Sequence, residues 1–136
     1  QNILPATVSA DLQNTRSNLV DAYKKSELQE EVGLGIYALS SVIVDKAEPS
    51  EALKSNIVWS SGLNNPTYLL SSTQLDNFRH GESVAQEVDV KAEKGAYFVS
   101  SSLDISSSNE ESWFFVANVN QSISDVVEVS ELIRYE

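Results

Sequence analysis

The last third of the sequence contains three strand-like segments, at roughly 84–92, 96–105 and 113–121. Each can present one apolar face, which is typical of half-buried strands. Lys94 and Gly95 separate the first two segments, and a glycine supports the positive φ of a two-residue hairpin turn. The serine-rich stretch "SSSNEES" separates the second from the third. This pattern predicts a three-stranded antiparallel meander, and it constrains the fold more than any other feature.

One register of this meander keeps its inner face apolar, and it places Val88, Ser101 and Ala117 in one row with Gln86 diagonally beside them. Two small side chains in adjacent strands leave a hollow, in which a hydroxyl and an amide need partners. Ligand sites are commonly apolar hollows with a few polar groups. Gln86 and Ser101 are therefore candidate ligand-binding residues. The alternative is that a bulky side chain of the protein, such as Phe78, fills the hollow.

The N-terminal part predicts a long helix, from Pro5 to about Val32 and ending before Gly33. Five residues recur at alternating spacings of four and three, which is the seam of a helix that packs along another helix: Val8, Leu12, Thr15, Leu19 and Ala22. This helix either lies on its own domain or forms a homodimer, and the spacing favours neither alternative.

Two more strands are predicted at 36–46 and 56–62, followed by a short strand and a short helix within 67–81. The tail at 125–135 fits a strand or a helix, and its valines favour the strand. We expect a single α+β domain over 1–136. A helix occupies 1–33, and a five-stranded antiparallel sheet with short covering helices occupies 36–136.

The formal net charge is −11, from 20 acidic and 9 basic residues. Residues 82–136 contribute −8, from 11 acidic and 3 basic residues, and residues 1–81 contribute −3, from 9 acidic and 6 basic residues. Such a surface repels phosphate backbones and anionic lipids, so nucleic acid and membrane surfaces are excluded as partners. No apolar run is long enough to span a bilayer, so any membrane anchor is expected outside these 136 residues.

No motif predicts catalysis, and we expect neither an enzyme nor a cofactor or metal site. The chain has no cysteine and a single histidine, His80, which follows Arg79 in "NFRHGES". Arg79 is a candidate anion clamp, because its guanidinium can make bidentate contacts, or it lies in a solvated loop. The acidic pairs Glu30–Glu31 and Glu110–Glu111 lack the alternating ligands of a calcium loop.

The element order, from the long helix through two strands to a meander ending in "SWFFVANVNQSISDVV", resembles the Cache and PAS-like sensor domains of bacterial receptors. The resemblance implies an extracytoplasmic, periplasmic domain that binds a small molecule between its sheet and covering loops. It would transmit binding to the cytoplasmic output of a chemoreceptor, histidine kinase or diguanylate cyclase. Tyr68, Arg79 and Tyr97 have chemistry that suits ligand contacts in such a domain.

A second resemblance leads to another class of function. A helix followed by an antiparallel meander also looks like a truncated type IV pilin or pseudopilin, which is a filament subunit without a small-molecule site. Such proteins commonly pin their C-terminal region with a disulfide or a metal loop, and neither is visible in this sequence.

Overall fold

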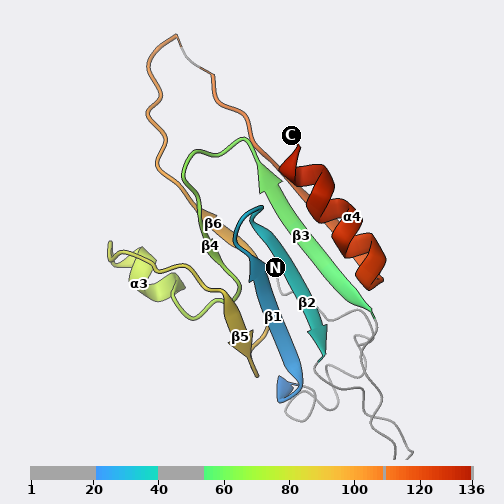
Figure 1. Cartoon of the computed structure of the whole chain (residues 1–136). Coiled ribbons are helices and arrows are strands. Elements are labelled where there is room, and N and C mark those ends of the chain that lie inside the picture. Colours follow the sequence, from blue (N-terminus) through green and yellow to red (C-terminus); the bar gives the residue numbers. More distant parts are fainter. Residues whose placement is uncertain (1–20, 40–53, 109, 136) are drawn as a thin grey trace, which may run out of the picture.

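The computed structural model describes residues 21–39, 54–108 and 110–135. Within these ranges the chain forms a central sheet with a helix on one face and a two-stranded ribbon on the other (Figure 1). The elements, in chain order, are β1 (Lys24–Gln29), β2 (Leu34–Leu39), β3 (Ser55–Ser61), β4 (Thr67–Leu69), α3 (Leu75–Arg79), β5 (Asp89–Lys91), β6 (Phe98–Ser100), β7 (Phe114–Gln121) and α4 (Ile123–Arg134).

The central sheet has five antiparallel strands in the order β5-β1-β2-β3-β7. A five-stranded antiparallel sheet was predicted and is present, but β1 takes the place of the predicted strand 96–105, and β2, β3, β4 and α3 overlap predicted elements. The predicted meander is wrong, because its three strands do not pair with one another. Instead β5 pairs with β1, β6 pairs with β4, and β7 pairs with β3.

The predicted long N-terminal helix is also wrong where the structure describes it, since β1 occupies Lys24–Gln29. Lys24, Ser26 and Leu28 are buried and alternate with more exposed residues, which is the period of a strand. Burial of the Lys24 ammonium is possible because it forms an ion pair with Asp21. Residues 1–20, which carry most of the expected dimer seam, lie outside the described residues.

The turn between β1 and β2 depends on Gly33. Its φ is +63°, and a Cβ there would lie 2.2 Å from the Tyr68 hydroxyl oxygen. Only glycine meets both conditions without strain. The β1–β2 hairpin can therefore fold closely under the ribbon.

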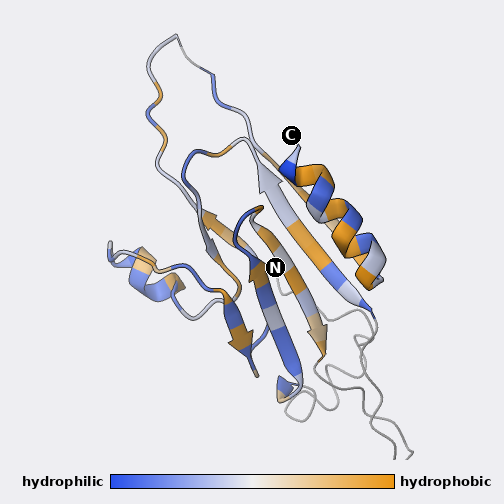
Figure 2. Cartoon of the chain, in the orientation of Figure 1, coloured by the Kyte–Doolittle hydropathy of each residue, from blue (hydrophilic) through white to orange (hydrophobic). Residues whose placement is uncertain are grey.

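Each face of the sheet has its own apolar core, and Figure 2 shows apolar residues along β2 and in the middle of β3. On the helix side Leu34, Ile57 and Trp59 pack against Val126 of α4. The core on the ribbon side contains Leu28, Tyr37, Val58, Tyr68 and Leu70. Because successive residues of a strand face opposite sides, the adjacent residues Ile57 and Val58 serve different cores.

The C-terminal segment is a helix, so the preference for a strand over 125–135 is wrong. Ser122 is the N-cap of α4, and its side chain and that of Asp125 form a reciprocal capping box. Val126, Val129 and Ile133 place one face of α4 on the sheet. Arg134, in the last turn, donates a hydrogen bond to Glu31 in the β1–β2 turn. Neither described helix is long and apolar enough to cross a membrane.

Candidate functional site

The structure brings together only two of the five residues that the sequence suggested as ligand contacts. The rings of Tyr68 and Tyr97 lie with their centroids 5.9 Å apart, between the sheet and the ribbon. Gln86 is exposed and donates to Glu30 over 2.8 Å, and Arg79 is exposed and paired with Asp76 in its own helix. Ser101 donates to the backbone oxygen of Asn64 over 2.7 Å.

The predicted hollow beside Ser101 does not form, because its three residues lie on separate elements. Val88 precedes β5, and its backbone oxygen accepts a hydrogen bond from Leu28 of β1. Ser101 follows β6, and Ala117 lies in β7 opposite Val58 of β3. The row that would have enclosed a ligand therefore does not exist.

A tyrosine cluster fills the space between the sheet and the ribbon. Tyr37 donates to the backbone oxygen of Ala96 over 2.7 Å, and Tyr97 donates to that of Gly33 over 2.6 Å. Burial raises the pKa of both phenols above the usual value for tyrosine. Protonated hydroxyls that donate to backbone carbonyls hold the layers together, so this cluster is a structural feature of the core.

The carboxylate of Glu87 is a second polar centre, and sequence reasoning missed it. Its Oε2 accepts from the backbone nitrogens of Leu70 and Ser71, over 2.7 and 2.8 Å. Its Oε1 accepts from Ser71 Oγ, Thr73 Oγ1 and Gln74 Nε2, over 3.1, 3.2 and 2.8 Å. Five donors from one segment thus surround one carboxylate, which fixes the connection between β4 and α3. The sequence offered only the small polar run "SSTQ" as a signal.

An apolar groove of about 300 Å³ lies where the first turns of α4 meet the sheet. Ile36 and Ala38 of β2 line it from below, and Ile123, Val126 and Val127 of α4 form its wall. Lys54 and Gln29 add polar groups at its border. Part of the apolar surface at the start of α4 is therefore accessible from outside.

The two edges of the sheet differ sharply. β5 has three residues, and its Asp89 and Lys91 form an ion pair across 3.1 Å. β7 has eight residues, "FFVANVNQ", none of them charged and none of them proline. Short length and charge protect an edge strand from pairing with another chain. The β5 edge has both kinds of protection and the β7 edge has neither.

Residues 101–108 and 110–113 lie between β6 and β7 and extend beyond the end of the sheet (Figure 1); we call them the arm. It is fixed at its base on both sides. Ser101 bonds to Asn64, as described above, and Ser112 passes close to Gly62, where a Cβ would lie 2.4 Å from the Ser112 backbone oxygen. The φ of Gly62 is +93°, so glycine is required there for two reasons.

Large apolar side chains of the arm and of the adjoining start of β7 face solvent. We call this set the arm–β7 surface. Its members, with their exposed fractions, are Leu103 (37%), Ile105 (58%), Trp113 (46%), Phe114 (49%) and Phe115 (52%). Phe115 makes an edge-on contact with Tyr97, with ring centroids 6.2 Å apart, so it is held in place although half exposed. Phe114 and Phe115 are adjacent in a strand, so they lie on opposite faces of β7, and each face exposes large apolar side chains.

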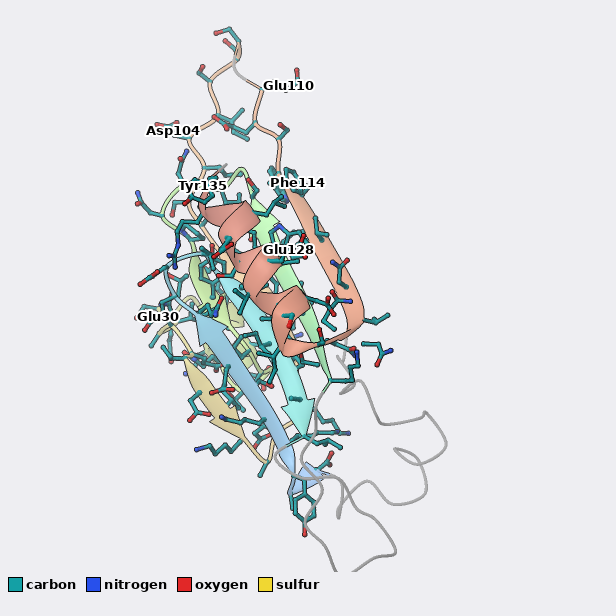
Figure 3. The ribbon with its side chains drawn as sticks, turned by 45° about the vertical axis from the view of Figure 1, so that its right-hand side comes forward. Glu30, Asp104, Glu110, Phe114, Glu128 and Tyr135 are labelled. Atoms are coloured by element: carbon teal, nitrogen blue, oxygen red, sulfur yellow. The ribbon has the colours of Figure 1, made fainter. Side chains whose placement is uncertain are left out.

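The chain segments on either side of the arm–β7 surface are mainly acidic, and the one basic residue of α4 is Arg134, which pairs with Glu31. The stretch 95–133 contains no lysine, arginine or histidine and six acidic residues: Asp104, Glu110, Glu111, Asp125, Glu128 and Glu131. Figure 3 shows Asp104 and Glu110 on the arm beyond Phe114, and Glu128 on α4. The aromatic surface is therefore flanked by negative charge.

In the described part of the chain, no three or more His, Asp or Glu side chains are grouped so that they could hold a metal ion. Comparison of the sequence with models of protein families and with curated proteins gives no match.

Proposed function

We propose that this chain is a protein-binding domain and that the arm–β7 surface is its contact surface. The observation that carries the proposal is the half-exposed aromatic trio Trp113, Phe114 and Phe115 at the start of an uncharged edge strand. Large aromatic residues are enriched among the residues that dominate binding energy at protein interfaces.

The fixed geometry of the surface supports the proposal. Phe115 rests against Tyr97, and the base of the arm is anchored at Asn64 and Gly62. A surface that is ordered before binding loses less conformational entropy when a partner arrives. The proposal shares with the pilin-like alternative the idea that the chain acts by contacting protein, and it does not require an N-terminal helix.

A matched pair of substitutions tests this function. Phe114 and Phe78 are both about half exposed, at 49% and 58%, but Phe78 lies on α3, outside the arm–β7 surface. Truncation of an aromatic residue at the centre of an interface costs about 2 kcal/mol or more, which is roughly a thirtyfold loss of affinity. We expect Phe114→Ser to lose a bound protein that Phe78→Ser retains.

The measurement is quantitative affinity capture from an extract of the cells that produce the chain, with wild type and both variants at equal concentration. Circular dichroism confirms that each variant is folded. The proposal fails if no protein is retained by wild type, or if every retained protein binds Phe114→Ser as well as wild type.

A second candidate is the extracytoplasmic small-molecule sensor, and the groove beneath α4 favours it. A ligand there would contact Val126 and Val127 of the last described helix, through which a receptor could respond to binding. A thermal-shift screen of small amphipathic carboxylates is the test, because a ligand raises the melting temperature by mass action. The substitution Ala38→Leu, which fills the groove, should remove the shift. This candidate fails if no compound gives a shift that Ala38→Leu removes.

A further inference from the structure

We propose that the partner adds an extended, lysine- or arginine-rich segment to β7 as a further strand of the central sheet. This inference rests on the proposed function and specifies the mode of binding and the chemistry of the partner. It is carried by the backbone of β7, by the charge around it and by the side chains on its two faces.

The backbone of β7 offers a template for pairing. In an antiparallel ladder, alternate residues of an edge strand direct their N–H and C=O groups away from the neighbouring strand. Among the described residues, β3 is the strand that pairs with β7. The ladder is regular from Phe114 to Asn118, and it becomes irregular opposite Ser55–Ile57, near Asn120 with its φ of +58°. The stretch suited to strand addition is therefore 114–118.

The charge around β7 selects the partner. The arm carries three acidic residues and α4 carries three more, so a basic segment added to β7 gains attraction from both elements that flank it in the sequence. A second copy of this chain would bring the same acidic residues together, and each copy carries a net charge of −11. The occupant that fits is therefore a basic segment of a different protein.

The side chains of β7 indicate the pattern of the added strand. Phe115 and Ala117 share one face of the strand and are exposed. Phe114 and Val116 share the opposite face, where Val116 packs on the core beneath α4. An added strand has apolar side chains beside Phe115 and lysine or arginine on its other face or at its ends.

Strand addition is tested with a synthetic heptapeptide that alternates lysine with valine, because main-chain hydrogen bonds supply affinity with little dependence on sequence. Two further versions carry N-methyl groups on alternate backbone nitrogens. One version methylates the nitrogens of the odd-numbered peptide residues and the other methylates those of the even-numbered residues, and we call these the two phases. A fourth version has glutamate in place of each lysine. Fluorescence anisotropy measures the dissociation constants, and hydrogen exchange reports on the amides of 114–118.

We expect the lysine peptide to bind and to slow exchange in β7. One N-methyl phase should weaken binding at least tenfold, and the other phase should leave it unchanged, because only one set of peptide N–H groups faces β7. The glutamate peptide should also bind at least tenfold more weakly. Ala117→Lys should weaken binding of the lysine peptide tenfold, whereas Ala85→Lys adds the same charge at another exposed alanine and should have no effect.

Four results overturn the inference: no binding of the lysine peptide, equal binding of the two N-methyl phases, glutamate-peptide binding as tight as lysine-peptide binding, or exchange in β7 that does not slow. A fifth overturning result would come from sedimentation of the chain without peptide. A dimer that Ala117→Lys dissociates would identify a second copy as the occupant. If the peptides fail while Phe114→Ser still loses a captured protein, the proposed function stands and only the mode of binding is wrong.

Discussion

Replacement of Glu87 is the sharpest test of how the connection between β4 and α3 is held. In Glu87→Ala, all five donors around the carboxylate lose their acceptor. Two of them are the backbone nitrogens of Leu70 and Ser71, and both residues are at most 1% exposed. A buried N–H without an acceptor costs about 1–3 kcal/mol.

The cost for two such N–H groups is less than twice the cost for one, because Glu87 is partly exposed and water can enter after truncation. We therefore expect Glu87→Ala to lower the free energy of unfolding by about 2–4 kcal/mol. For a chain of this size that is a fall of roughly 10 °C in melting temperature.

Glu87→Gln separates hydrogen bonding from side-chain volume. An amide has one oxygen, so its NH₂ group must face one of the two donor sets. The hydroxyls of Ser71 and Thr73 can turn to accept from it, while the amide of Gln74 is held by Ala85 through both of its atoms, over 2.9 and 2.8 Å. We expect a loss of about 1–2 kcal/mol, less than that in Glu87→Ala.

Urea denaturation followed by circular dichroism measures both losses. Glu93→Ala and Glu93→Gln are the controls, because Glu93 is exposed. The reasoning is refuted if Glu87→Ala and Glu87→Gln destabilise the protein equally, or if both lie within about 0.5 kcal/mol of wild type, the range usual for surface substitutions.

Three further predictions concern the arm and the last helix. Gly62→Ala should shift the base of the arm and weaken partner binding, because its Cβ would lie 2.4 Å from the Ser112 oxygen; hydrogen exchange that stays unchanged in the arm would contradict this. Ser122→Ala should lower the free energy of unfolding by about 1 kcal/mol through loss of the N-cap, measured by urea denaturation, and no change would show that α4 does not need its cap. Hydrogen bonds from Ser122 lower the pKa of Asp125 below its usual 3.8. The Asp125 carboxylate therefore contributes to the free energy of unfolding above about pH 4, and this contribution declines as the pH falls through the lower folded-state pKa. Thermal melts of wild type and Asp125→Asn should therefore differ at neutral pH and converge in acid, and a constant difference would exclude the carboxylate as the cause.

The sequence predicted most strands but not their partners. The meander model assumed that neighbours in sequence pair in space, and Lys94–Gly95 suited a tight turn. In the structure Val90 lies opposite Ser26 and Val99 lies opposite Tyr68. Pairing depends on long-range packing of both faces of the sheet, which periodicity within one segment cannot report. The site predicted at Ser101 failed because it depended on that register.

The secondary-structure predictions failed at the two ends of the described chain for different reasons. In β1 the buried positions include Lys24 and Ser26, so the strand has almost no apolar signal to separate it from a preceding helical pattern. At α4 the signal was present: Ser122 followed three residues later by Asp125 is a capping-box pattern, and it should have outweighed the valines. β1 is a strand because it pairs with β2 and β5, and α4 begins as a helix at its capping box.

The unequal edges of the sheet limit the stoichiometry of any complex formed at β7. A strand added there extends the sheet on one side, while the charged, three-residue β5 closes the other side. Growth by pairing of strands at both edges is therefore blocked within the described domain. Such a complex contains one partner segment for each copy of this chain and terminates, where a sheet with two open edges could continue into a fibre.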